Sequence, residues 1–541
     1  IDAFAEGAAV LFLFSIAELL EDYSVERSRR SLSKLVDLTP KVASVKRGSR
    51  FVETSIEEIR VGDIIRVRPG ENIGTVIEGH SSVNQAPITG ESMPVDKCVG
   101  DVVFAGTINQ EGSLNIKAAK EAKDSTLAKI IGLVESAEEQ KAPTERFIDR
   151  FARFYTPSVV GLSIGVATVP TLLLGQSFNV WFYKALLLLL ISCPCALALS
   201  TPISIVSGIT SGARNGVLFK GGLYVEKLAK IDTFAFDKTG TLTEGRPIVT
   251  DVIPVNGYTR REVLTIASSL ECLSEHPLGK AIVELSEEER VSTMDVMEFK
   301  AESGRGIVGR IGKERYLVGS RKLFSTRALS NLKGILSKLE DEAKTIVIVG
   351  KRNRVAGIIG ISDIIREDSK DMVNSLHKMG VKRIVMITGD NRKTAEAVAS
   401  RIGVDEYYSE LLPEQKVRVI EELGEGRGKV AMVGDGVNDA PALAAADLGV
   451  AMGVAGSDTA LEVADIALMN DDLSKVPYLL SLGKKTMAVV RQNIVLSIGI
   501  KLLFAILVFP GLVTLWMAVA IGDMGVSLGV ILNALRISKL R

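Results

Sequence analysis

The stretch Asp237-Lys238-Thr239-Gly240-Thr241-Leu242-Thr243 decides the fold of this chain and indicates its chemistry. It follows Thr233-Phe234-Ala235-Phe236, an apolar and β-prone run, so Asp237 is expected where a strand ends and a loop begins. Ligands of open α/β sheets bind at that carboxyl edge. A carboxylate there, with a lysine beside it and three threonines after it, suits a nucleophile that accepts a phosphoryl group and becomes an acyl phosphate.

Length and composition indicate several domains, part of them in a membrane. The 541 residues exceed one ordinary domain. The 65 basic and 65 acidic residues cancel, so the charge balance gives no indication of a nucleic-acid partner. A hydrophobic share of 47% beside a charged share of 24% implies charged globular parts separated by long apolar stretches. Four cysteines are too few for a secreted disulfide framework of this size.

Five apolar stretches are long enough to cross a bilayer, at about 3–21, 156–175, 183–207, 487–509 and 512–534. Basic residues flank the ends next to the two long polar segments, whereas the turns near 175–177 and 510–511 carry almost no charge. The positive-inside rule then places both large segments in the cytoplasm, with the chain expected in the cell membrane. Because residue 1 lies inside an apolar stretch without a charged n-region, we interpret the start as a truncation point, not a signal peptide.

The two polar segments have different patterns. Residues 41–120 consist of short β-rich runs broken by glycine, such as 60–67 and 102–106, which predicts a small β domain. The second segment alternates helical stretches with strand-like runs at 381–387, 429–433 and 448–452. This alternation predicts a doubly wound parallel sheet. Residues 246–362 interrupt the alternation and are interpreted as an inserted domain.

Acidic and hydroxyl clusters follow two further strands of that sheet. Thr388-Gly389-Asp390 comes after 384–387, and Gly434-Asp435-Gly436-Val437-Asn438-Asp439 comes after 430–433. Asp237 and Asp435 are expected to hold Mg²⁺, a hard cation that prefers carboxylates. Thr388, Lys238 and Lys416 are expected to hold phosphoryl oxygens. Either cluster alone would usually be a turn, but their shared position at strand ends favours a catalytic site.

In this order, these motifs resemble the phosphorylation domain of P-type ATPases, which has a haloacid-dehalogenase-like fold. Thr89-Gly90-Glu91-Ser92 is similar to the actuator motif of that family and implies that Glu91 positions the water that hydrolyses the aspartyl phosphate. The implied fold is multidomain: a helical transmembrane bundle, an α/β haloacid-dehalogenase-like phosphorylation domain, an α+β nucleotide-binding insert and a small β-rich actuator domain.

The resemblance extends to nucleotide-binding residues. Ser274-Glu275-His276-Pro277 and Gly304-Arg305-Gly306 are similar to those of the heavy-metal branch, although an isolated His-Pro pair is a plain loop in most proteins. The resemblance implies contacts with ATP from Glu271, His276, Gly304 and Gly306. It further implies a catalytic role for Thr239, cofactor contacts from Asp390 and Asn438, and a magnesium contact from Asp439.

Cys193-Pro194-Cys195 lies near the middle of the third apolar stretch. Proline removes a backbone donor and frees carbonyl groups. Two thiols beside such a break suit a soft metal such as zinc, cadmium, lead or copper(I). Two buried cysteines that act as small hydrophobes are the alternative. The likeness to the Cys-Pro-Cys of the heavy-metal-transporting branch favours metal ligation.

Ionisable residues inside the apolar stretches narrow the choice of the predicted metal ion. Lys501, Asp523 and Glu6 are costly within a bilayer and are therefore functional candidates. Asp523 with two thiolates suits a divalent ion, and Lys501 would neutralise Asp523 when no metal is bound. Lys501 together with Asp523-Met524-Gly525 resembles the zinc, cadmium and lead subgroup, which implies an exit path at Glu6 and Phe14.

The sequence therefore predicts ATP-driven export of divalent zinc, cadmium or lead through an aspartyl phosphate, with ATP, Mg²⁺, the metal ion and the lipid bilayer as partners. One alternative is a copper(I)-exporting P-type ATPase, but the copper-type methionine would fall on Asp523. Others are a membrane-tethered phosphatase without transport and a non-transporting fragment that lacks the family's N-terminal helices. The expected domains are 1–35 (helix and stalk), 36–145 (actuator), 146–230 (two helices with Cys-Pro-Cys), 231–245 with 363–475 (phosphorylation), 246–362 (nucleotide binding) and 484–541 (two helices).

Overall fold

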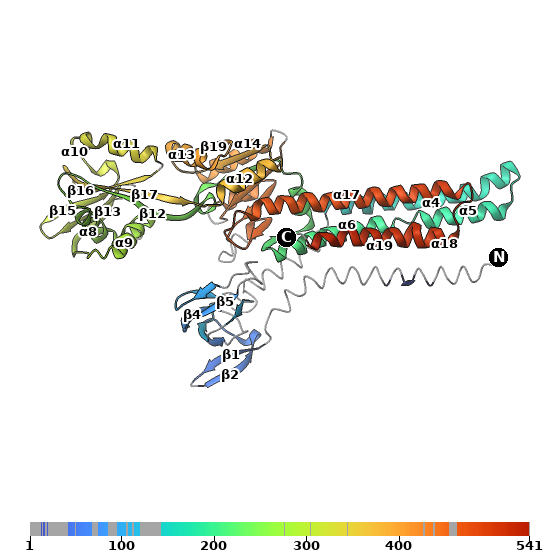
Figure 1. Cartoon of the computed structure of the whole chain (residues 1–541), viewed down its shortest axis with the longest axis horizontal. Helices are drawn as coiled ribbons and strands as arrows, with labels where there is room; N and C mark the ends of the chain where they lie inside the picture. The colour runs from blue at the N-terminus through green and yellow to red at the C-terminus, as the bar shows by residue number, and fades with distance from the viewer. Residues whose placement is uncertain are drawn as a thin grey trace. The chain divides into compact units, whose positions relative to one another are not determined.

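The computed structural model describes residues 12, 15–16, 19, 42–48, 50–67, 74–84, 95–103, 107–110, 113–119, 142–274, 276–302, 305–342, 344–425, 428–435, 439–453 and 462–539. The chain divides into two compact units (Figure 1). The first unit contains residues 1–231, 450–471 and 475–541, and the second contains 232–449 and 472–474.

A small β domain occupies the first polar segment, as the glycine-broken pattern predicts. A six-stranded sheet has the order β2-β1-β3-β9-β4-β7, and a three-stranded sheet has the order β6-β5-β8. Alternate residues such as Val45, Ile65 and Leu114 fill its core. The strands are β1 (Val42–Arg47), β2 (Arg50–Ser55), β3 (Ile64–Val67), β4 (Gly74–Glu78), β5 (Ser81–Asn84), β6 (Val95–Lys97), β7 (Val102–Val103), β8 (Ile108–Asn109) and β9 (Leu114–Lys117).

Long apolar helices form a bundle in the same unit. Within the part of the chain that the structure describes, four helical segments are long and apolar enough to cross a membrane: Pro143–Leu174, Phe178–Arg214, Lys475–Val508 and Leu515–Ser538. They confirm four of the five predicted spans, and most of the stretch 3–21 lies outside the described residues. The elements are α4 (Pro143–Leu174), α5 (Phe178–Ile191), α6 (Cys195–Arg214), α17 (Lys475–Val508), α18 (Leu515–Met517), the π-helical η7 (Ala518–Gly525), α19 (Val526–Leu535) and η8 (Arg536–Lys539). Large exposed side chains on their outer faces, such as Leu172, Leu502 and Leu532, suit contact with lipid.

Short strands and a short helix lie where the chain passes between the two units in sequence. Helix α7 (Gly222–Leu228) follows β10 (Val217–Phe219), which pairs antiparallel with β22 (Ile466–Leu468). β22 in turn pairs in parallel with β21 (Leu448–Ala451), through Val450 opposite Ile466.

A parallel sheet in the second unit confirms the predicted doubly wound pattern. β11 (Thr233–Asp237) pairs in parallel with both β18 (Arg383–Ile387) and β20 (Val430–Gly434), and β18 pairs with β19 (Glu406–Tyr408). Every residue of β11 is buried, as a continuous apolar run requires in such a sheet. The helices are α12 (Ser369–Lys378), α13 (Arg392–Ile402), α14 (Pro413–Glu425) and α15 (Ala440–Ala445).

An inserted domain interrupts this sheet domain. Its antiparallel sheet has the order β12-β17-β16-β15-β14-β13, with helices on both faces (Figure 1). Leu264 of α8 packs on one face against Ile359, and Leu336 of α11 packs on the other against Ile348. The elements are β12 (Thr243–Pro254), α8 (Arg260–Glu271), α9 (Pro277–Glu288), β13 (Val296–Glu302), β14 (Gly306–Ile311), β15 (Glu314–Gly319), α10 (Thr326–Leu329), α11 (Lys333–Asp341), β16 (Thr345–Lys351) and β17 (Arg354–Ile365). β12 and β17 pair from end to end, so a two-stranded ribbon joins the insert to the loop after Asp237.

Candidate functional sites

Asp237 is the last residue of β11 and is only 5% exposed. Its Oδ2 accepts a hydrogen bond from the Thr239 backbone N–H at 3.0 Å, which fixes the start of the loop. Its Oδ1 accepts from Lys416 Nζ at 2.6 Å, and the same ammonium donates to Asp439 Oδ1 at 2.7 Å. Lys416 lies in the first turn of α14 and Asp439 directly before α15. One lysine therefore bridges two buried carboxylates at the carboxyl edge of the sheet.

This cluster shifts the protonation of its members. Burial, together with repulsion from Asp439, raises the pKa of Asp237 to about 7, although Lys416 acts in the opposite direction. Burial also raises the pKa of Asp439. Burial alone would lower the pKa of Lys416, but the two carboxylates raise it above its ordinary value. The lysine therefore stays charged, and its charge favours the ionised form of Asp237.

The other two predicted strand ends meet Asp237 at this edge. The register sets Asp237 opposite Ile387, so Thr388 begins the neighbouring loop. Thr388 is buried, and its hydroxyl accepts from the Asp390 backbone N–H at 3.1 Å. Lys238 Nζ lies 2.6 Å from Asp390 Oδ2, so these two predicted residues form an ion pair.

The fit of Mg²⁺ depends on the carboxylates around the Asp237 loop. A Cβ added to Gly240, which has a φ of +75°, would lie 3.4 Å from Asp435 Oδ2, so that carboxylate faces the loop closely. Asp439 Oδ2 is buried without a hydrogen-bond partner among the described residues. Within the same residues, no group of three or more histidine, cysteine, aspartate or glutamate side chains could hold a metal ion. Mg²⁺ usually takes one or two carboxylates plus waters and substrate phosphates, so Asp237 and Asp435 fit it.

Glu271 and His276 occupy the predicted nucleotide region of the insert. Glu271 ends α8, and burial raises its pKa to about 7 although Ser274 bonds to it. A Cβ on Gly279 of α9 would overlap Oε2 of Glu271, so only glycine leaves room for this carboxylate. Gly279 stands three residues after His276 and was not predicted to be functional, because it is not part of the motif that singled out His276. His276 is exposed, and its Nδ1 accepts from the Leu278 backbone N–H at the start of α9.

Gly306 has a structural reason to be glycine besides the predicted contact with ATP. Its φ is +137°, and a Cβ there would overlap the carbonyl of Val318 on the paired strand β15. Gly304, Asn438, Glu91, Glu6 and Phe14 lie outside the described residues.

The Cys-Pro-Cys break is visible in the bundle. α5 ends at Ile191, α6 begins at Cys195, and Pro194 stands between them. Lys501 Nζ of α17 donates to the carbonyl groups of Ile191 (3.2 Å) and Cys193. The cation therefore binds backbone oxygens at the point where proline interrupts the helix.

Lys501 also binds the predicted metal carboxylate. Its Nζ lies 3.0 Å from Asp523 Oδ1, and the two residues are 9% and 7% exposed. Asp523 stands in the π-helical segment η7, a type of irregularity that is frequent at functional sites. Cys193 is half-buried, and a metal-binding cysteine is the thiolate. The side chain of Cys195 is not described.

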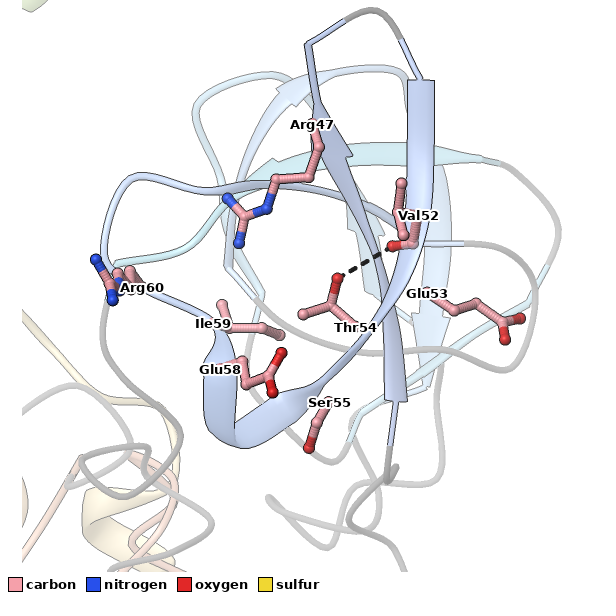
Figure 2. Close-up of a pocket in the computed structure, with 8 residues that line it drawn as sticks. All are labelled: Arg47, Val52, Glu53, Thr54, Ser55, Glu58, Ile59 and Arg60. Carbon is pink, nitrogen blue, oxygen red and sulfur yellow. Dashed lines mark hydrogen bonds between the residues drawn. The ribbon is translucent and has the colours of Figure 1, made fainter.

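A cleft of about 870 Å³ opens in the β domain, and none of the residues that line it is predicted from the sequence to be functional (Figure 2). The Thr54 hydroxyl donates to the carbonyl of Val52 at its wall. Arg47 pairs with Asp63 at 2.6 Å, so its guanidinium is already neutralised. We assign the cleft no role. It is lined by Arg47, Val52, Glu53, Thr54, Ser55, Glu58, Ile59 and Arg60.

Comparisons with known proteins agree with this geometry. Residues 37–135 match the P-type ATPase actuator domain, and residues 231–447 match the haloacid dehalogenase-like hydrolase family. A cadmium-transporting ATPase of Staphylococcus aureus is 46% identical over 100% of the chain and 76% of that relative. The zinc/cadmium/lead-transporting P-type ATPase of Escherichia coli (strain K12) is 39% identical over 100% of the chain and 73% of that relative. A crystal structure of a zinc-transporting PIB-type ATPase in the E2.Pi state aligns with a TM-score of 0.68 at 39% identity, over 99% of the chain and 88% of that structure.

Proposed function

The chain belongs to the heavy-metal-transporting P-type ATPases, and we propose that its export of divalent metal ions proceeds through phosphorylation of Asp237. It is a metal-translocating ATP hydrolase, related over its whole length to cadmium and zinc transporters. The observation that carries the assignment of Asp237 is the shared ammonium of Lys416, which donates to a buried carboxylate at the end of β11 and favours its ionised form.

In the proposed transfer, an Asp237 oxygen attacks the γ-phosphorus of ATP. A bond forms between that oxygen and phosphorus, and the bond to the β–γ bridging oxygen breaks, with its electron pair leaving on ADP. Lys416 favours the ionised nucleophile, and the Thr239 N–H orients it through the 3.0 Å bond. Lys238 and Thr388 lie at the same edge and would hold the transferred oxygens. Mg²⁺ held by Asp237 and Asp435 would neutralise phosphate charge.

Turnover needs a base for the water that cleaves the acyl phosphate. We assign that role to Glu91, on the support of its Thr-Gly-Glu-Ser motif and of the actuator match over residues 37–135. Binding of ATP is assigned to the insert, through Glu271, His276, Gly304 and Gly306, with further contacts from Asp390 and Asn438. Asp439 would assist the magnesium site through its unpartnered oxygen.

The cargo is proposed to bind Asp523 and the thiolates of Cys193 and Cys195, and to leave past Glu6. Support comes from the buried pair of Lys501 and Asp523, because a carboxylate removed from water requires a cation nearby. Lys501 supplies that charge until a divalent ion arrives. Zinc, cadmium and lead fit this mixed set of soft and hard ligands. The helices cross the cell membrane in this proposal, with the large domains in the cytoplasm.

The test is formation of an acid-stable phosphoenzyme from radiolabelled ATP in the full-length protein, with reductant present. Zinc or cadmium should stimulate it, and Asp237→Asn should abolish it. Asp523→Asn should abolish the metal stimulation, whereas Asp341→Asn, which alters an exposed carboxylate, should keep it. A phosphoenzyme that forms equally well without metal and in Asp523→Asn would instead indicate a membrane-tethered phosphatase.

A further inference from the structure

Eight hydroxyl groups inside the helical bundle are buried without a hydrogen-bond partner in the described part of the chain. The four that lie nearest in sequence to the Cys-Pro-Cys break, Lys501 and Asp523 are Ser200, Thr201, Ser497 and Ser527. Ser200 and Thr201 of α6 are 0% exposed, Ser497 of α17 is 1% exposed and Ser527 of α19 is 4% exposed. A serine inside a helix can bond to the carbonyl four residues earlier, as Ser204 does at 2.7 Å in the same helix. Buried hydroxyls are rarely left unpaired, so these four indicate a partner such as water or an ion.

The bonds between α17 and α19 place two of these hydroxyls at one level. Lys501 binds Asp523 at 3.0 Å, and about two turns away Asn493 donates to a backbone carbonyl of α19. Ser497 lies four residues from both Lys501 and Asn493, hence on the same face of α17. Ser527 lies four residues after Asp523 on the antiparallel helix. The two hydroxyls therefore face a shared space one helical turn from the ion pair.

Helix α6 brings the other two hydroxyls to the same region. The carbonyl of Cys193, just before α6, accepts from Lys501, and Gly208 of α6 contacts Thr486 of α17. Fifteen residues separate Cys193 from Gly208 and Lys501 from Thr486, so the two segments run antiparallel with matched spacing. Thr201 consequently lies opposite Asn493, and Ser200 lies beside it on α6. Helices α6, α17 and α19 pack on one another, so unpartnered hydroxyls of all three lie near one level of the bundle.

We propose that these four hydroxyls form a second, oxygen-lined subsite for the transported divalent cation, which rests there with part of its hydration shell. The proposal rests on the export function above and adds a site to it. The subsite lies one to two turns from Lys501 and Asp523, on the side of the N-terminal half of α17. Neutral hydroxyls hold a hydrated cation more weakly than thiolates and a carboxylate do. An ion would therefore pass from the subsite to Asp523.

The subsite also predicts an effect on selectivity. Zinc retains oxygen and water ligands more strongly than the softer cadmium, which depends more on thiolates. Loss of the hydroxyls should therefore impair zinc more than cadmium. A change that only disturbed helix packing would affect both metals alike.

The experiment uses the full-length protein in liposomes with reductant, and measures the zinc and cadmium concentrations that give half-maximal ATPase activity. In Ser497→Ala/Ser527→Ala, the zinc concentration should rise about tenfold, equivalent to ~1.4 kcal/mol, and the cadmium concentration by less than about threefold. Ser204→Ala, which removes a buried hydroxyl that already has a partner, is the matched control and should leave both unchanged. Zinc affinity from competition with a chelating dye should fall in parallel with the zinc response.

Equal metal responses of wild type and the double variant would overturn the subsite, and so would a similar loss for zinc and cadmium. Ser497→Cys offers a second variant, because a softer ligand at that position should improve the cadmium response relative to zinc. If wild type itself shows no metal stimulation, the export function fails. If wild type responds to metal and the serine variants respond identically, only the subsite fails.

Discussion

Replacing the proposed nucleophile, Asp237→Asn, should make the sheet domain more stable at neutral pH while it abolishes phosphorylation. The folded-state pKa of Asp237 is about 7, against 3.8 for an ordinary aspartate, because the group is buried and repelled by Asp439. Between pH 4 and 7 the folded state therefore binds more protons than the unfolded state. Stability must fall as pH rises through that window and level off above about pH 7.

The size of the effect follows from the shift. Each pKa unit corresponds to about 1.4 kcal/mol, so ionising Asp237 costs the folded state on the order of 4 kcal/mol. Asparagine removes this cost, although it also loses the charged bond to Lys416. The ammonium keeps its second partner, Asp439, at 2.7 Å. A net gain of about 2 kcal/mol near pH 8 is expected, and no gain near pH 4.

Amide hydrogen exchange of β11 in the full-length protein, without nucleotide or Mg²⁺, measures this local stability. Protection in Asp237→Asn should exceed that of wild type by about thirtyfold at pH 8, and the difference should shrink steadily toward pH 5. Asp341→Asn is the control, because that carboxylate is exposed and far from the cluster in sequence. Parallel curves for wild type and Asp237→Asn across this range would refute the electrostatic reasoning.

Three further outcomes are expected. Lys416→Gln leaves two buried carboxylates without their ammonium, so phosphoenzyme formation should slow by about a hundredfold and its pH optimum should rise, which rapid-quench kinetics against pH would show. Gly279→Ala should displace Glu271 and weaken binding of ATP about tenfold by calorimetry, with unchanged affinity arguing against a nucleotide role for that carboxylate. Glu226 accepts from both the backbone N–H and the hydroxyl of Thr144 at the start of α4. Glu226→Ala should therefore destabilise the bundle by about 1–2 kcal/mol, which a lower unfolding temperature would show. An unchanged unfolding temperature would contradict the capping role.

The strand ends were predictable because apolar runs define strands and parallel strands end at a common edge. The register that sets Asp237 opposite Ile387 brings the Thr388 loop beside it, as the sequence pattern implied. The bonds from Lys416 to both Asp237 and Asp439 could not be predicted from the sequence. Its bonds join residues 179 and 23 positions apart, and no periodicity encodes such distances.

Hydropathy located the membrane helices but not their full lengths. α4 begins at Pro143 although its apolar stretch begins near 156, because polar residues such as Arg146 and Arg150 continue the helix outside the apolar window. The sequence also did not indicate which hydroxyls lack a hydrogen-bond partner. Serine and threonine within an apolar run are ordinary in membrane helices, and only packing shows which of them lack a partner.

The nucleotide-side and membrane-side sites use the same electrostatic arrangement. In one, Lys416 neutralises Asp237 and Asp439; in the other, Lys501 neutralises Asp523 and binds carbonyls freed at Pro194. A buried carboxylate without a cation is strongly unfavourable, so each lysine preserves an ionised oxygen ligand before a divalent ion is present. If a divalent ion binds at each site, as proposed, the lysine and the metal would compete for one carboxylate. Each site would then have two charge states, one with lysine alone and one with metal, which suits a pump that alternates between states.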